Sequence, residues 1–146
     1  MSEGYVFDTE AIISFLYNEP GHQRVGTLLE RVAAGDVEGH LAETNASEVY
    51  YLVARFEGTA EDEPTAASLR TADRDIRALT RNGLTLARAD WRQVGEIKAD
   101  GDISLADAAA VGLAAEHDAT LVVGADDDFD SLPVAVDMER FRTDSV

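Results

Sequence analysis

The sequence has 146 residues, of which 45% are hydrophobic, so it is long enough for a single domain spanning residues 1–146 and too short for two ordinary domains. Twenty-nine Asp and Glu residues oppose twelve basic residues and give a net charge of −17, and the absence of cysteine excludes disulfides, thiolate metal sites and a cysteine nucleophile. No apolar run is long enough to span a membrane and no signal-like segment begins the chain, so we expect a soluble, cytoplasmic protein.

The first half of the chain alternates between strand-like and helix-like patterns. Apolar residues 4–8 predict a buried strand that ends at Asp8, and residues 37–42 predict a second strand. Between and after these strands, apolar residues recur at spacings of three and four, which predicts three helices. Their apolar stripes are Ala11, Ile12, Phe15 and Leu16; Val25, Leu28, Leu29 and Val32; and Val49, Leu52, Val53 and Phe56.

The second half continues this alternation. A fourth helix is predicted by the stripe of Leu69, Ala72, Ile76 and Leu79, and two more helices are predicted over residues 91–99 and 105–117. Residues 84–87 and 120–124 predict buried strands, and residues 134–137 a weaker one. The single tryptophan, Trp91, is expected to pack in the core. Because strands alternate with helices, the predicted fold class is α/β, with a parallel sheet covered on both faces.

The acidic residues are spread along the chain from Glu3 to Asp144, and Lys98 is the only lysine. This pattern resembles proteins of salt-accumulating halophiles, in which acidic side chains coat the surface. Self-repulsion of this size destabilises a compact chain and is relieved when salt screens it. Any single Asp is therefore more often part of the surface coat than of a site, so a functional role has to be inferred from position.

Several acids occupy positions that a parallel sheet brings together. Ligands bind at the carboxyl ends of parallel strands. Asp8 ends the first strand and Asp126 follows the fourth, while Glu48 and Asp107 lie at predicted helix starts. Four carboxylates that meet in one crevice repel each other unless a cation lies among them, and a hard divalent cation such as Mg²⁺ prefers oxygen ligands.

Each of these acids also has a purely structural interpretation. Asn45 with Glu48, and Ser104 with Asp107, have the spacing of a capping box. Asp8 is a candidate cap for the helix that follows it. The sequence leaves both interpretations open for each residue taken singly.

The order and spacing of these motifs resemble the PIN domain, in particular the VapC-type toxin nucleases of bacterial and archaeal toxin–antitoxin modules. The resemblance covers nearly the whole chain. It rests on residues 5–9 (YVFDT) with the helix after them, on residues 44–49 (TNASEV), on residues 103–108 (ISLADA) and on residues 114–129.

The resemblance implies a three-layer α/β/α fold whose five-stranded parallel sheet has its first and fourth strands adjacent at the centre. It implies a metal-dependent endoribonuclease that uses Mg²⁺ or Mn²⁺ to hydrolyse RNA phosphodiester bonds and is held by a cognate antitoxin, with a homodimer expected. The implied catalytic and metal-binding residues are Asp8, Glu48, Asp107 and Asp126, with Asp128 as a supplementary ligand and Thr9 as polar support. Glu48 is left open as ligand, orienting group or general base.

One departure from the family pattern concerns Gly124, where the family usually has Thr or Ser. A missing hydroxyl there keeps two alternatives open. One is a PIN-fold protein that binds RNA or a partner without cleaving it. The other is an RNA-processing PIN nuclease without an antitoxin.

Two surfaces are predicted to bind partners. The first is an exposed face of the fourth helix that either guides RNA or forms a solvated ionic network; its residues are Arg70, Arg74, Arg77 and Arg81, with Arg88 and Arg92 as a second possibility of equal weight. The second is aromatic and lies on the third helix, where it either holds an antitoxin segment or packs against the fourth helix or a twin subunit; its residues are Tyr50, Tyr51 and Phe56.

Overall fold

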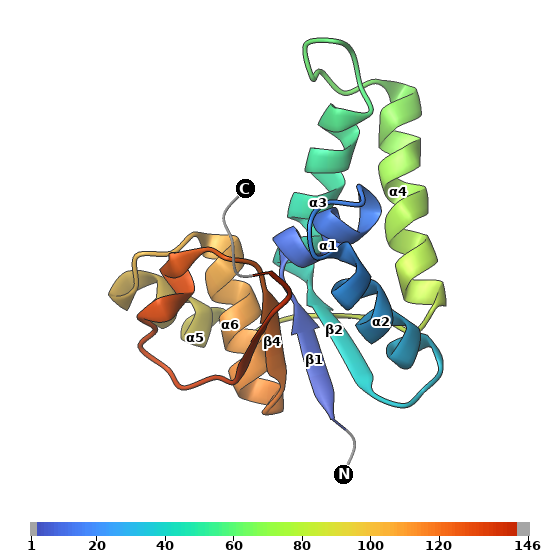
Figure 1. The fold of residues 1–146 in the computed structure, drawn as a ribbon. Helices are drawn as coiled ribbons and strands as arrows, with labels where there is room; N and C mark the ends of the chain where they lie inside the picture. The colour runs from blue at the N-terminus through green and yellow to red at the C-terminus, as the bar shows by residue number, and fades with distance from the viewer. Residues whose placement is uncertain (1–2, 143–146) are drawn as a thin grey trace.

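The described part of the chain, residues 3–142 of a computed structural model, is built around a five-stranded, all-parallel sheet (Figure 1). Its strands run in the order β3-β2-β1-β4-β5 and are β1 (Gly4–Phe7), β2 (Glu38–Ala42), β3 (Thr85–Ala87), β4 (Thr120–Val123) and β5 (Met138–Arg140). Val6 of β1 pairs with His40 on one side and with Leu121 on the other. The first and fourth strands are therefore adjacent at the centre, as predicted, and the strand order reverses between them.

Helices cover both faces of the sheet, which confirms the predicted three-layer α/β/α architecture. They are α1 (Thr9–Leu16), α2 (His22–Ala33), α3 (Glu43–Phe56), α4 (Ala66–Arg81), α5 (Trp91–Asp100), α6 (Leu105–His117) and the 3₁₀ helix η1 (Asp127–Asp130). Successive residues of β1 point to opposite faces. Phe7 belongs to the core that includes Ile12 and Val49, on the side of α1 to α4, whereas Val6 belongs to the core that includes Leu113 of α6.

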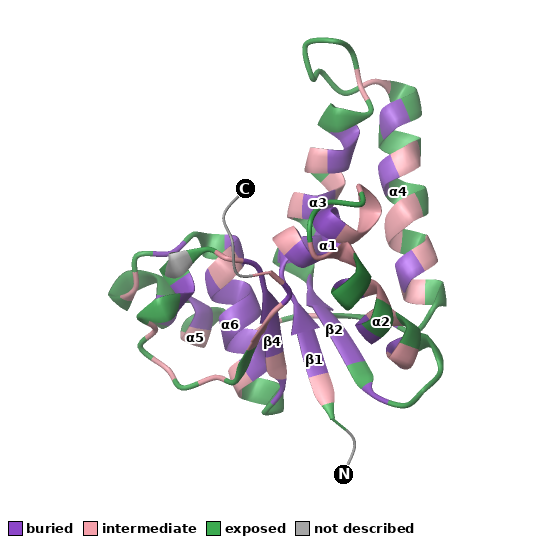
Figure 2. Cartoon of the chain, in the orientation of Figure 1, coloured by how far each residue is buried: buried purple, intermediate pink, exposed green. Residues whose placement is uncertain are grey.

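Burial is concentrated in the three central strands, β1, β2 and β4, and in α6, whereas the edge strands β3 and β5 are mostly exposed or half-buried (Figure 2). Helix α6 is rich in alanine, and its residues from Ala108 to Ala114 are all buried. Small side chains allow a helix to approach the sheet closely, so α6 forms the inner part of its layer and α5 packs outside it. Among residues 3–142, no helix is both long and apolar enough to cross a membrane.

Helices α3 and α4 pack side by side and extend together beyond the carboxyl ends of the strands (Figure 1). The predicted stripe of α4 is only partly buried. Ala72 and Leu79 are buried, but Leu69 is exposed. The reason is that the N-terminal end of α4 lies far from the sheet, beside α3 alone.

Two local predictions were wrong. The fifth strand occupies Met138–Arg140 and not residues 134–137. Val134 and Val136 lie in a loop and pack partly buried against the core on the α6 side, so their alternation reflects packing and not strand pairing. Trp91 does not pack in the core: α5 buries Val94 and Ile97, and Trp91 in its first turn is 78% exposed.

Candidate metal centre

Asp8 lies at the turn from β1 into α1 and has two roles at once. One of its carboxylate oxygens accepts a hydrogen bond of 2.7 Å from the backbone N–H of Ala11, so it caps α1. The side chain is also only 2% exposed and lines the cleft described below. Burial raises the pKa of Asp8 well above its usual value, the Ala11 N–H opposes that shift, and the charges of Glu10, Asp107 and Glu48 add to it.

The second acid is positioned by α3, which begins immediately after β2. Because the helix starts at Glu43, Asn45 is a fully buried helical residue and not a cap, so the capping interpretation of the Asn45–Glu48 spacing was wrong. The amide nitrogen of Asn45 donates a 3.0 Å hydrogen bond to the hydroxyl of Thr9. Thr9 is thereby fixed beside Asp8, and Glu48 lies half-buried one turn further along α3.

The third acid, Asp107, lies in the first turn of a capped helix, and the fourth, Asp126, is itself a cap. The Ser104 hydroxyl accepts a hydrogen bond from the backbone N–H of Asp107, so Ser104 caps α6. Asp126 caps η1 by accepting from the backbone N–H of Asp128. Burial raises the pKa of Asp107 to about 6, the Ser104 hydrogen bond opposes this, and the charges of Asp126, Glu48 and Asp128 contribute to the increase.

The structure brings four of the predicted site acids, Asp8, Glu48, Asp107 and Asp126, into one cleft of about 310 Å³ at the carboxyl edge of the sheet, and the supplementary ligand Asp128 lies beside it. Carboxylate oxygens of Asp107, Asp126 and Asp128 all lie within 4.8 Å of one another. Asp8 and Glu48 are outside this close group, but both line the same cleft. The charge of Glu48 also raises the pKa of Asp107. The lining residues are Asp8, Thr9, Glu10, Ile13, Glu48, Leu52, Ser104, Asp107, Asp126 and Phe129.

The donor chemistry of this cleft fits a divalent cation. Within residues 3–142, no Arg or Lys forms an ion pair with Asp8, Glu48 or Asp107. Their mutual repulsion is therefore not relieved by the protein itself. Oxygens bound to one Mg²⁺ lie at most about 4.2 Å apart, so three Asp carboxylates within 4.8 Å of one another need only small side-chain rotations to bind a single ion.

Sequence reasoning missed a fifth acid, Glu10. Its carboxylate lies over Gly124, where a built Cβ atom would be 2.5–2.7 Å from the carboxylate atoms. Arg142 forms an ion pair with Glu10 and holds it there. The only sequence signals were the position of Glu10 in the first turn after Asp8 and the missing side chain at residue 124.

A second missed residue, Arg140 of β5, organises the loop after β4. One of its guanidinium nitrogens donates to the backbone oxygens of Gly124 and Asp126, at 2.7 and 2.9 Å, and another donates to the carboxylate of Asp130. These bonds fix the backbone that carries Asp126. The sequence offered no local sign of them, because β5 lies well beyond this loop in the chain.

The arginines of α4 are not brought to the cleft. None of Arg70, Arg74, Arg77 and Arg81 lines it, and all four are exposed. The guanidinium of Arg77 forms an exposed ion pair of 2.8 Å with Asp73. Arg77 therefore takes part in a solvent-exposed ion pair on the surface of α4, which is the second of the two predicted interpretations.

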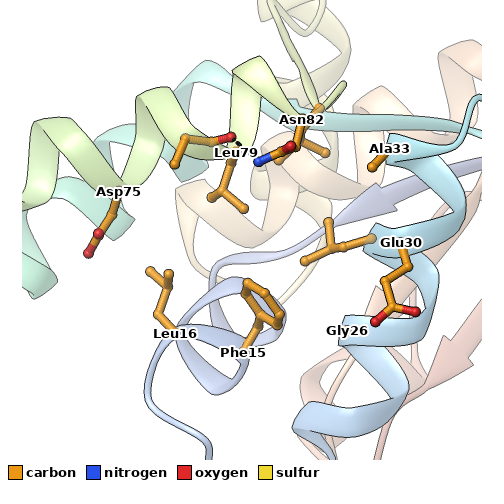
Figure 3. A pocket seen from close by; sticks show the side chains of 11 residues that line it. Phe15, Leu16, Gly26, Glu30, Ala33, Asp75, Leu79 and Asn82 are labelled. Atoms are coloured by element: carbon orange, nitrogen blue, oxygen red, sulfur yellow. Dashed lines mark hydrogen bonds between the residues drawn. The ribbon is translucent and has the colours of Figure 1, made fainter.

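A separate, mostly apolar hollow of about 350 Å³ lies between α1, α2 and α4 (Figure 3). Phe15 and Leu16 reach into it from α1, and Leu79 faces them from α4. The predicted aromatic surface of α3 lies nearby and is partly used within the chain. Phe56 packs edge-to-face against Tyr17 with ring centroids 5.4 Å apart.

Comparisons with known proteins agree with this fold. A family profile for the PIN domain matches residues 5–135. Among curated proteins, none has a sequence that matches significantly.

Solved structures with the same fold include VapBC2 from Rickettsia felis bound to a DNA fragment from its promoter, at 14% identity and a TM-score of 0.66, covering 94% of this chain and 98% of that one. DNA-bound VapBC from Salmonella typhimurium matches with 14% identity and a TM-score of 0.62, over 97% of this chain and 99% of that one. FitAcB from Neisseria gonorrhoeae matches with 16% identity and a TM-score of 0.58, over 94% of this chain and 97% of that one. At these identities the likeness shows the fold.

Proposed function

Because the chain belongs to the PIN domain family, we propose that it is a metal-dependent endoribonuclease that acts as the toxin of a toxin–antitoxin pair. The observation that carries the proposal is the convergence of Asp8, Glu48, Asp107 and Asp126 in one cleft, where none of the four forms an ion pair with a described Arg or Lys. Such a cluster suits a hard divalent cation, and a bound cation of this kind can promote phosphodiester hydrolysis.

Each acid has a separate task in this proposal. Asp107, Asp126 and Asp128 would hold Mg²⁺ or Mn²⁺, and such an ion would supply Lewis-acid polarisation of the scissile phosphate. Asp8, fixed by the Ala11 N–H, orients the water from the end of β1. Glu48 comes from α3, outside the close group of three, and accepts the proton of the attacking water at its carboxylate.

The fold holds these groups in place without help from the substrate. Asp8 and Asp126 follow the two central strands, and Asp107 lies in the first turn of the buried helix α6. Arg140 fixes the backbone at Asp126, and Asn45 fixes Thr9. A site built on rigid elements suits a reaction whose catalysis depends on positioning and charge stabilisation.

A cleavage assay tests the proposal. The purified chain is incubated with mixed RNA at molar KCl, with Mg²⁺, with Mn²⁺ and with EDTA. We expect cleavage only with metal, and loss of cleavage in Asp8→Asn and Asp107→Asn. The matched control is Asp73→Asn, which removes an acid from the surface of α4 and leaves the cleft intact. A wild-type chain that binds RNA but never cleaves it would instead establish the non-cleaving alternative.

The proposal includes two protein partners, an antitoxin and a second copy of the chain. The similar structures described above are VapBC2, VapBC and FitAcB, and the family resemblance to VapC-type toxins is the reason for extending the pairing with an antitoxin to this chain. The apolar hollow between α1, α2 and α4 and the aromatic residues of α3 offer the antitoxin an apolar surface. Co-purification with the product of the adjacent gene, with loss of cleavage on mixing, tests this. A solitary gene whose product is harmless when overexpressed points to the RNA-processing alternative.

A further inference from the structure

Trp91 is the most exposed large hydrophobic side chain among residues 3–142, at 78%. Leu105, at the start of α6, is 56% exposed, and it lines a hollow that Trp91 also lines. Aromatic side chains contribute most when they are buried, so a tryptophan left in water beside a second exposed apolar residue indicates a contact surface. Nothing in the proposed chemistry of the carboxylate cleft uses it.

The hollow beside Trp91 has a volume of about 320 Å³, and its mostly apolar lining includes one basic residue, Arg88, and one acidic residue, Glu43. Val94 and Leu105 form part of the apolar lining. The guanidinium of Arg92 lies 5.4 Å from the centre of the Trp91 ring. An aromatic face accompanied by guanidinium groups is the arrangement on which nucleic acid bases stack while the phosphates meet positive charge.

This hollow adjoins the carboxylate cleft through two shared helices. Leu105 lines the hollow, and the preceding residue, Ser104, lines the cleft. On α3, Thr44 borders the hollow and Glu48, one turn later, borders the cleft. One helical turn is about 5.4 Å, so the two sites lie within the reach of neighbouring nucleotides of a single strand.

Two guanidinium groups, those of Arg88 and Arg92, are the local positive charges available to a phosphate in this strongly acidic chain. Arg88 faces Glu43 at 3.4 Å, but both side chains are largely exposed, and such a pair contributes little and exchanges readily for another anion. The carboxylate of Asp90 is occupied as the cap of α5, where it accepts from the N–H of Arg92. A second copy of this chain is the competing occupant, and the test below distinguishes it from RNA.

We propose that Trp91, with Arg88, Arg92 and Leu105, forms a subsite for a nucleobase of single-stranded RNA whose backbone enters the carboxylate cleft. This inference rests on the proposed function and specifies how its substrate is held. It replaces the arginines of α4 with Arg88 and Arg92 as the substrate contacts.

The test uses the fact that Trp91 is the only tryptophan, so intrinsic fluorescence reports on this site alone. The cleavage-deficient Asp107→Asn chain is titrated with a short single-stranded RNA at a KCl concentration that keeps it folded. We expect the Trp91 emission to be quenched and to become protected from acrylamide. In the same background, we expect Trp91→Ala to weaken RNA binding roughly 5- to 150-fold, while Trp91→Phe keeps most of the affinity.

Phe56→Ala is the matched control, because Phe56 is also an exposed aromatic residue but lies at the far end of α3; we expect its RNA affinity to be unchanged. In otherwise wild-type chains, Trp91→Ala should raise KM much more than it lowers kcat. Unchanged Trp91 emission together with unchanged affinity of Trp91→Ala, in a chain that does cleave RNA, overturns the subsite. If Trp91→Ala converts a dimer of the chain into a monomer and leaves RNA affinity unchanged, the subsite is also overturned and the surface is assigned to self-association. A wild-type chain that neither binds nor cleaves RNA refutes the proposed function itself.

Discussion

The carboxylate of Glu10 fills the space that a side chain at Gly124 would occupy. The two residues are far apart in sequence, yet a Cβ atom on Gly124 would lie 2.5–2.7 Å from the Glu10 carboxylate atoms. Glycine at the end of β4 therefore admits an acid from α1, which Arg142 then holds by an ion pair. The position where a hydroxyl was expected is supplied with carboxylate oxygens from another element.

This relationship predicts that the two positions are energetically coupled. Gly124→Ala forces Glu10 away from Arg142, and we expect it to lower the free energy of unfolding by about 1 kcal/mol. In a Glu10→Ala background the same substitution should cost much less, because the carboxylate is gone. Chemical denaturation of the two single variants and the double variant measures the coupling. Additive effects within error would show that the contact has no energetic consequence.

Metal binding should stabilise the chain through the Asp cluster. At one hundred times its Kd, Mg²⁺ should add about 2.7 kcal/mol to the free energy of unfolding. We expect Asp107→Asn to lose this increment and, in EDTA, to be slightly more stable than wild type because one like charge is removed. Thermal melts with and without Mg²⁺ measure both effects, and Asp73→Asn should respond to Mg²⁺ like wild type. An unchanged metal response in Asp107→Asn would refute the assignment of this ligand.

The raised pKa of Asp107, about 6, predicts the direction of a pH dependence in the metal-free protein. A carboxyl whose pKa is higher in the folded than in the unfolded state binds its proton more tightly when folded. Stability should therefore rise as the pH falls from 7 through about 6 toward 4, and the buried Asp8 acts in the same direction. Asp107→Asn should flatten the melting temperature over this range relative to Asp73→Asn. An identical slope in the two variants would exclude Asp107 as a source of the effect.

The net charge of −17 predicts a strong dependence on salt. We expect the chain to loosen or unfold in dilute buffer and to become compact at molar KCl, where repulsion between exposed charges is screened. Circular dichroism and light scattering across a KCl series follow this transition. A melting temperature that does not change with salt would show that the acids are compensated locally.

If the antitoxin binds the hollow between α1, α2 and α4, a charge placed there should release it. Leu16 lines this hollow and lies outside the carboxylate cleft, so Leu16→Asp should weaken antitoxin binding while leaving RNA cleavage intact. Leu69→Asp is the control, because Leu69 is exposed on α4 outside the hollow. Binding measured by calorimetry should fall only for Leu16→Asp. Equal affinities for the two variants would place the antitoxin on another surface.

Local patterns in the sequence are enough to predict the α/β class and a parallel sheet covered on both faces, and the resemblance to PIN domains adds the set of acids in the cleft. Asp8 and Asp126 follow apolar runs that form the two central strands, and the carboxyl ends of parallel strands meet at one edge. Local periodicity is enough to locate such strand ends. It also located α6 from its first residue to its last, because its apolar run is long and bounded by the cap at Ser104.

Tertiary structure alone decided which residues support those acids and which surfaces stay open. Glu10 meets Arg142 across nearly the whole chain, and Arg140 reaches back to the loop after β4. Trp91 is exposed because Val94 and Ile97 orient α5, and Asn45 reaches Thr9 because α3 starts without a loop after β2. A periodic pattern specifies which face of an element is buried, but the partner on that face depends on how distant elements pack, and no local pattern records it.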